Sequence, residues 1–192
     1  MKPFLSASLL GALLIFAGCG GGSPEYQIPG DTELESISLQ GISLKKPPSW
    51  ELIDRTDRPD AIPSDVILLM RSVEPWGAQL NFALVGVGKE KLPENTSSIQ
   101  YAKAAVQKTE QEIVNYESVS EEDIDIQGNK AIFLQFRGKE SLSGDVREWF
   151  HLFVAKNDMG YVVSAVTPLD AEANQKEFIK SIVKSFAFRE AS

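Results

Sequence analysis

Residues 131–166, AIFLQFRGKESLSGDVREWFHLFVAKNDMGYVVSAV, decide the fold of this chain. The stretch contains three apolar runs, at 131–137, 146–155 and 161–166. A loop at 138–144 and a turn at 157–160 separate them, and a further strand at 117–126, with a turn at Gly128 and Asn129, comes just before. Connections this short join neighbouring antiparallel strands, so the pattern predicts a four-stranded meander.

Shorter strands are predicted upstream of the meander. They lie at 34–39, 42–44, 66–70 and 79–87, with turns at Gly41 and at 74–77. In the strand at 79–87, apolar residues alternate onto both faces, so we expect both faces to be covered. The segment 50–65 is rich in Asp, Arg and Pro, and it is predicted to be irregular with one helical turn.

Two long helices complete the predicted elements. Ser97 followed by Gln100 matches a capping box, and the apolar spacing behind it predicts a helix over 97–115. Thr167, Pro168 and Asp170 mark the start of a closing helix that is predicted to end at 185–188. Its buried stripe comprises Phe178, Ile179, Ile182, Val183 and Phe186.

The predicted fold class is α+β. These elements form an α/β/α-like sandwich with a central, mainly antiparallel sheet and two long helices. A sheet with two apolar faces needs a second cover, which the opening strands or the segment 50–65 could supply. Trp50 and Trp149 are predicted to lie in the core, and Trp76, at a hairpin tip, is a candidate partner contact.

The amino terminus has the layout of a secretion signal. Lys2 precedes an apolar run at 4–16, about 13 residues and shorter than the roughly 17 to 25 that span a bilayer. Ala17 and Gly18 then precede Cys19, the only cysteine. This arrangement resembles the lipobox of bacterial lipoproteins, although Phe16 stands where leucine is usual. The resemblance implies that Cys19 is lipidated, and ordinary secretory cleavage with an incidental thiol is the alternative.

Four regions are predicted along the chain. They are a lipoprotein signal peptide at 1–18, a lipidated N-terminus and flexible tether at 19–33, a single domain at 34–188 and a tail at 189–192. Removal of the signal peptide takes away Lys2 and leaves 18 basic against 27 acidic residues, or 18 − 27 = −9. Such a body is repelled by nucleic acid and by anionic lipid, so the anchor supplies the membrane affinity.

Loose fold motifs suggest a family. They are Pro47, Pro48, Ser49 and Trp50 after an early strand, a central helix starting at Ser97, a turn at 127–130, and Ser185, Phe186, Ala187 and Phe188 at the end. Together they resemble the PsbP and DcrB superfamily of lipoproteins and extrinsic subunits. The resemblance implies a non-enzymatic protein that assists a membrane complex from the lumenal or periplasmic side, or that serves an envelope function.

Candidate catalytic and metal-binding residues are few. His151, the only histidine, lies between Trp149 and Phe153, and we expect a partly buried strand residue with one hydrogen bond rather than a general base. One histidine and an acylated cysteine do not build a typical zinc site, so no metal or cofactor is expected. Gly86, Gly88 and Lys89 lack the remaining residues of a phosphate loop. A helix cap explains the sequon at 95–97.

The densest acidic cluster comprises Glu121, Glu122, Asp123 and Asp125. Asp123 could open a calcium loop, but Leu134 occupies the twelfth position, where that loop needs a glutamate. A solvated strand face is therefore favoured, and a weak surface cation site is the alternative.

The leading functional hypothesis is a membrane-tethered extracytoplasmic lipoprotein that acts as a non-catalytic binding or assembly factor for an envelope or membrane complex. The alternative is a carrier or sensor of a small apolar ligand, with a pocket near 50–65. A hydrolase using Asp123 and Asp125, or Asp54, Asp57 and Asp60, comes third. Gly20 after Cys19 favours the outer membrane where one exists. The oligomeric state stays open.

Overall fold

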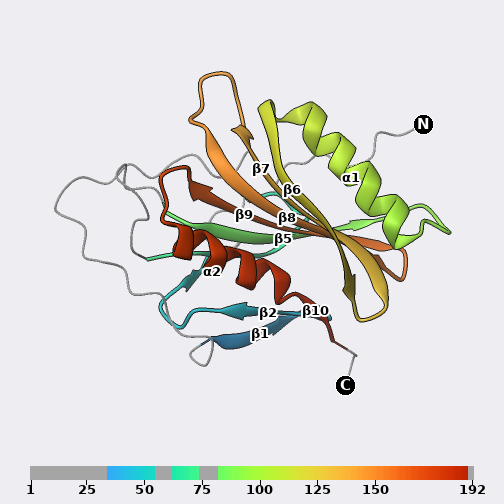
Figure 1. Cartoon of the computed structure of the whole chain (residues 1–192). Helices are drawn as coiled ribbons and strands as arrows, with labels where there is room; N and C mark the ends of the chain where they lie inside the picture. Colours follow the sequence, from blue (N-terminus) through green and yellow to red (C-terminus); the bar gives the residue numbers. More distant parts are fainter. Residues whose placement is uncertain (1–33, 55–61, 74–81, 190–192) are drawn as a thin grey trace.

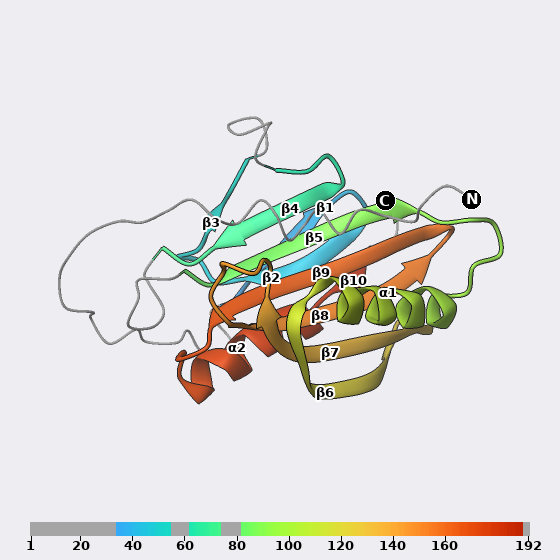
Figure 2. The same ribbon diagram turned by 90° about the horizontal axis from the view of Figure 1, so that it is seen from above.

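The computed structural model describes residues 34–54, 62–73 and 82–189. Within these residues the chain forms two helices and two β-sheets (Figures 1 and 2). The helices are α1 (Ser98–Glu112) and α2 (Ala173–Lys184). The strands are β1 (Glu35–Leu39), β2 (Ile42–Lys46), β3 (Glu51–Leu52), β4 (Val66–Arg71), β5 (Leu84–Lys91), β6 (Val114–Ile126), β7 (Asn129–Lys139), β8 (Arg147–Lys156), β9 (Met159–Pro168) and β10 (Ala187–Phe188).

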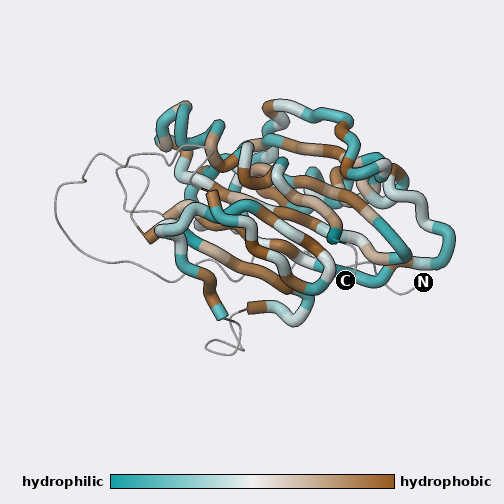
Figure 3. The backbone as a smooth tube through the Cα atoms, turned by 90° about the horizontal axis from the view of Figure 1, so that it is seen from below, coloured by the Kyte–Doolittle hydropathy of each residue, from teal (hydrophilic) through white to brown (hydrophobic). Residues whose placement is uncertain are grey.

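The central layer is a seven-stranded antiparallel sheet with the strand order β3-β4-β5-β9-β8-β7-β6 in the described residues. Strands β6 to β9 follow one another along the chain and pair with their neighbours, so the predicted meander is confirmed. β8 lies between β9 and β7, and its inner residues are buried on both faces. Figure 3 shows the strands as largely hydrophobic, which explains why the sheet is covered on both sides.

Helix α1 covers one face of this sheet, over β7 and β8. It begins at the predicted capping box, in which Ser97 Oγ accepts from the Gln100 amide and Gln100 Oε1 accepts from the Ser97 amide. It ends at Glu112 rather than at 115, because Ile113 is extended and leads directly into β6. Ala102 and Val106 pack into the apolar cluster beneath the helix.

The opposite face is covered by α2 together with a three-stranded sheet of order β1-β2-β10 (Figure 1). The predicted opening strands and the turn at Gly41 are therefore confirmed, and they supply part of the second cover. Helix α2 contacts β8 and β9 of the large sheet and β2 of the small one. Its predicted stripe is buried, from Phe178 through Val183.

The prediction for the closing helix is wrong at both ends. Thr167 and Pro168 belong to β9, where they pair with Glu148 and Arg147, and α2 begins only after Glu172. The helix ends at Lys184, and Ala187–Phe188 forms β10 against β2. Phe186 and Phe188 both contact the ring of Tyr161. Two residues that are two positions apart and face the same way follow the period of a strand, not of a helix. The fit of Phe186 to the predicted helical stripe is therefore a coincidence.

Two upstream predictions also need correction. The segment 50–65 is not wholly irregular, because Glu51–Leu52 pairs with Arg71 and Met70 as β3. β5 occupies Leu84–Lys91 rather than 79–87, since its partner β9 continues to Met159, which lies opposite Lys91. Residues 79–81 and the predicted turn at 74–77 lie outside the described residues. Trp50 and Trp149 are buried, as predicted.

Candidate interaction surface

One end of the large sheet is here called the entry end, because the described chain begins there. It is the end at which β4, β7 and β9 finish and β5 and β8 begin. Cross-strand pairing places Glu51, Arg71, Leu84, Val166 and Trp149 in one row across the sheet. Residues 72–73, the β7–β8 loop at 140–146 and the β9–α2 connection at 169–172 lie beyond this row.

Lys46 fastens the beginning of the described chain to this end. Glu35 is the first residue of β1, and its Oε2 forms an ion pair with Lys46 Nζ at 3.4 Å. The same nitrogen donates to the backbone carbonyls of Pro47 at 2.8 Å and Trp50 at 3.1 Å. Trp50 precedes Glu51, whose carboxylate accepts from the Arg71 guanidinium at 2.9 Å. The start of β1 is thereby connected to the row of paired residues.

Exposed apolar side chains gather at the entry end. Five of them, called the apolar rim below, are Leu52, Val73, Leu142, Val146 and Leu169. Leu142, in the β7–β8 loop, is 86% exposed, the highest value among the exposed large apolar residues in the described part of the chain. Val119 lies level with the same row on edge strand β6, next to Ser118, which pairs with Phe136 opposite Trp149, and Leu39 lies at the end of β1. The concentration of the rim residues at one end marks it as a candidate contact surface, made of separate apolar side chains rather than one contiguous patch.

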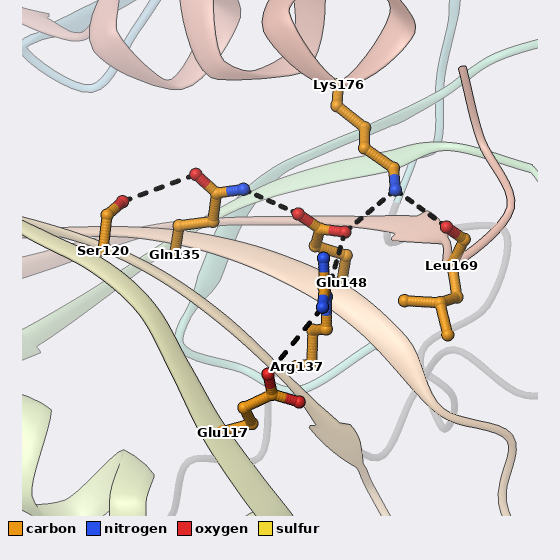
Figure 4. A network of polar contacts seen from close by, with 7 residues as sticks. All are labelled: Glu117, Ser120, Gln135, Arg137, Glu148, Leu169 and Lys176. Atoms are coloured by element: carbon orange, nitrogen blue, oxygen red, sulfur yellow. Dashed lines mark hydrogen bonds and ion pairs between the residues drawn. The ribbon is translucent and has the colours of Figure 1, made fainter. Parts of the chain in front are cut away.

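A buried carboxylate lies close to the β9–α2 connection that carries Leu169 of the rim (Figure 4). Glu148, on β8, is 2% exposed and accepts hydrogen bonds from Gln135 Nε2 at 2.6 Å and from Lys176 Nζ at 2.9 Å. Arg137 adds an ion pair at 3.5 Å. Burial alone would raise the pKa of Glu148, but these hydrogen bonds and cations outweigh burial and lower the pKa. Glu148 is therefore ionised at neutral pH.

The Glu148 network joins four elements. Lys176 comes from α2 and also donates to the backbone carbonyl of Leu169 at 2.7 Å, which fixes the β9–α2 connection. Gln135 and Arg137 come from β7, and they reach β6 through Ser120 at 3.4 Å and Glu117 at 3.8 Å. The buried charge network thus holds the β9–α2 connection, which carries Leu169 of the apolar rim.

Glu140, at the start of the β7–β8 loop, has a strongly perturbed titration. Burial raises its pKa from 4.5 to about 7, and the Arg147 guanidinium opposes that shift. One of its carboxylate oxygens is buried without a hydrogen-bond partner in the described part of the chain. A half-buried carboxyl of this kind changes charge near neutral pH, beside the most exposed residue of the rim.

His151 lies under α1 and away from the entry-end loops. Its Nε2 forms one hydrogen bond, with Ser164 Oγ at 2.9 Å, and Phe136, Trp149 and Phe153 surround the ring. Burial lowers its pKa from 6.5 to about 3, so the imidazole is neutral. The predicted strand histidine with one hydrogen bond is observed, though it is fully rather than partly buried.

The predicted acidic cluster lies along edge strand β6. Asp123 and Asp125 are both exposed, and Asp125 accepts from the Gly128 amide at 2.6 Å and pairs with Lys130 at 3.3 Å. These contacts, the backbone hydrogen bond first, lower the pKa of Asp125 and stabilise the β6–β7 turn. Glu122 pairs with Lys184 of α2. In the described residues, no group of three or more His, Cys, Asp or Glu side chains is placed to hold a metal ion.

Several predicted sites lie elsewhere or outside the described residues. Gly86, Gly88 and Lys89 lie within β5 rather than in a loop, which excludes a phosphate loop there. Cys19, Trp76, Asp57 and Asp60 are outside the described residues, and Asp54 alone of its group is inside. The apolar pocket expected near 50–65 stays a prediction. Across the described ranges, no helix has the length and apolar character needed to cross a bilayer.

Sequence reasoning missed Glu148, Lys176 and Glu140. One signal for Glu148 was present: it begins the apolar run EWFHLFVA, where a charge is unusual in a strand buried on both faces. Such a charge needs a partner, but nothing in the sequence points to Lys176, which is 28 positions away. No sequence pattern indicates that Glu140 is half-buried, because its burial depends on the path of the β7–β8 loop.

Comparison with known proteins agrees with this architecture. A family model described as PsbP-like protein matches residues 26–188. The chain belongs to the PsbP-like family. This confirms the PsbP-like part of the resemblance seen in the sequence motifs. None of the curated protein sequences matches the chain significantly.

Solved structures show that the PsbP-like fold extends to distant proteins. Cyanobacterial PsbP (CyanoP) from Synechocystis sp. PCC 6803 has 16% identity and a TM-score of 0.56, over 90% of this chain and 98% of that one. LpqN of Mycobacterium tuberculosis, involved in cell envelope biogenesis, has 11% identity and a TM-score of 0.58, over 82% and 91%. The Ran-binding protein Mog1p of Saccharomyces cerevisiae has 13% identity and a TM-score of 0.56, over 81% and 95%. At such identities the likeness shows the fold alone.

Proposed function

We propose that this PsbP-like protein is a lipoprotein, anchored through Cys19 on the extracytoplasmic side of a bacterial membrane. There it acts as a non-catalytic binding or assembly factor for an envelope or membrane complex. The observation that carries the proposal is the position of the family domain. The family match begins at residue 26, a few residues after Cys19, so the signal-like segment and the cysteine precede the domain and form no part of it.

Structural neighbours support a binding role. Mog1p is described as Ran-binding, and LpqN is described as involved in cell envelope biogenesis. CyanoP is the cyanobacterial form of PsbP, the protein that gives the family its name. An envelope location and a protein partner are the features that we carry from these names to this chain.

Three ionisable side chains of the described residues, two of them considered from the sequence alone, are engaged in structural contacts. His151 is neutral and enclosed by aromatic rings, and Asp125 closes a turn. Glu148 is paired with Lys176 and Arg137. These side chains stabilise the domain, which supports a protein that works by contact rather than by general acid–base catalysis.

The mechanism that follows is effective concentration. The lipid confines the domain to a thin layer at the membrane, within the length of the tether predicted at 19–33. A weak interface can then be well occupied without tight intrinsic affinity. The body is acidic, with a charge of −9 after removal of residues 1–18, so nucleic acid is not the partner.

Crosslinking in intact membranes, followed by mass spectrometry, tests the proposal. The wild-type chain is compared with Cys19→Ala, which cannot accept a thioether-linked lipid, and with Gly21→Ala, which leaves Cys19 in place. We expect wild type and Gly21→Ala to capture the same envelope protein and Cys19→Ala to lose it. If the Cys19→Ala protein captures that partner equally well from solution, tethering is not the mechanism.

A further inference from the structure

The two ends of the large sheet differ in the side chains that they expose. At the far end, the connections are the β6–β7 turn, the β8–β9 turn and the loop before α1, and Leu92 donates to Asp158 to hold two of them together. Among the described residues, Leu39 is the one large apolar side chain exposed at that far end. The entry end carries the five residues of the apolar rim.

The entry end is also where the described chain begins. In Figure 1 the start of β1, the start of α2 and the β7–β8 loop all lie in the left half of the described molecule, with β1 at the bottom and the loop at the top. Leu34 precedes β1, and Glu35 forms an ion pair with Lys46 of β2, whose ammonium also donates to the carbonyl of Trp50 beside β3. Only the 14 residues at 20–33 separate it from Cys19. An anchor at Cys19 is therefore attached at the end that carries the apolar rim rather than at the far end.

Several acidic side chains at the entry end have cationic partners. Glu35 pairs with Lys46, Glu51 with Arg71, and Glu148 with Lys176 and Arg137. The loops that carry the rim also hold the carboxyl groups of Asp145, Asp170 and Glu172, so this end stays acidic. A bilayer surface without net charge does not repel it.

The shape of the rim favours lipid over a protein partner. Its side chains come from four separate places: β3, the residue pair after β4, the β7–β8 loop and the β9–α2 connection. Leu142 is flanked by Ser141 and Ser143 and projects singly. Fluid acyl chains and headgroups can surround isolated apolar tips, whereas a protein interface needs one contiguous and complementary patch.

We propose that the entry end rests on the bilayer that holds the anchor, with Leu142 at the boundary between headgroups and acyl chains. The inference depends on the lipid anchor proposed above, and it adds an orientation. The anchor supplies the membrane affinity, and the apolar rim decides which end faces the lipid. The sheet then stands away from the membrane, and its far end is presented to a partner.

The test uses the full lipidated chain in vesicles of phosphatidylcholine. Because Cys19 is the only cysteine and its sulfur would carry lipid, an introduced cysteine is the one free thiol. Leu142→Cys receives a nitroxide label, and Glu94→Cys, exposed at the far end, is the matched control. Collision of each label with oxygen and with a water-soluble nickel chelate reports its depth. We expect the label at 142 to lose accessibility to the chelate and to gain accessibility to oxygen, and the label at 94 to stay aqueous.

A second variant adds charge to the rest of the rim. Leu142→Cys combined with Val73→Asp and Leu169→Asp is expected to return the label to water, because both added carboxylates must stay hydrated. Aqueous labels at both 142 and 94 on anchored protein would overturn the docking and leave the anchor standing. If intact mass shows no added hydrocarbon and the protein does not sediment with the vesicles, the anchor itself fails, and docking fails with it.

Discussion

Replacement of Lys176 by methionine shows how firmly the Glu148 network holds the entry end. The change removes the ammonium group 2.9 Å from Glu148 Oε2 and the donor 2.7 Å from the Leu169 carbonyl, and it keeps most of the aliphatic stem. Removing one partner of a buried ion pair typically costs about 3–5 kcal/mol, because the other charge stays buried. Glu148 keeps Gln135 and Arg137, so we expect the free energy of unfolding to fall by about 2 kcal/mol.

Urea denaturation at pH 7, followed by circular dichroism, measures this loss. Lys180→Met is the matched control, since Lys180 lies on the same helix and pairs with Glu122 and Glu177 at 3.8 Å near the surface. We expect that control to lose less than about 1 kcal/mol. Equal losses in the two variants would refute the role given to Glu148.

Acid provides a second readout of the same variant. The pKa of Glu148 is lowered in the folded state, so its ionised form stabilises the fold above the ordinary value of 4.5, and that contribution is lost as the pH falls through the lowered value. The difference between wild type and Lys176→Met should therefore shrink below pH 4.5. A difference that persists unchanged in acid would assign the effect to packing.

Two other substitutions test features of the fold. Glu140→Gln should remove a pH dependence: the native pKa is raised from 4.5 to about 7, so wild-type stability should fall as the pH rises through that interval, by about 1 kcal/mol after allowance for solvent screening. Urea denaturation at pH 5 and pH 8 measures the change in the free energy of unfolding between the two pH values. An equal change in wild type and Glu140→Gln would contradict the prediction. Gly160→Ala would place a Cβ 2.6 Å from Tyr101 Cζ and should cost about 1–3 kcal/mol, with relief in a double variant with Tyr101→Leu. An unchanged melting temperature in the single variant would show that α1 moves freely.

Local patterns predicted much of the fold. The meander follows from three apolar runs with short turns, and the start of α1 follows from the reciprocal contacts of Ser97 and Gln100, because both depend on residues close in sequence. The end of α2 was missed because Phe186 satisfies two periodicities, and only pairing with β2 decides between them. Long-range pairing is invisible to a local pattern.

The candidate surface was harder to predict than the fold. The apolar rim assembles from residues between Leu52 and Leu169, which come together only through the strand order of the sheet. Glu148 was detectable as a charge in a buried strand, but its partner lies on the closing helix. A sequence alone also gives no sign that Glu140 is half-buried, because that depends on how the β7–β8 loop folds back.

Intact mass of the mature protein, extracted from native membranes with detergent, tests the central claim most directly. A tethered PsbP-like protein predicts a chain that begins at Cys19, lacks residues 1–18 and carries the added mass of fatty acyl groups on that first residue. A chain with a free thiol at Cys19, or one cleaved at another position, would contradict the account.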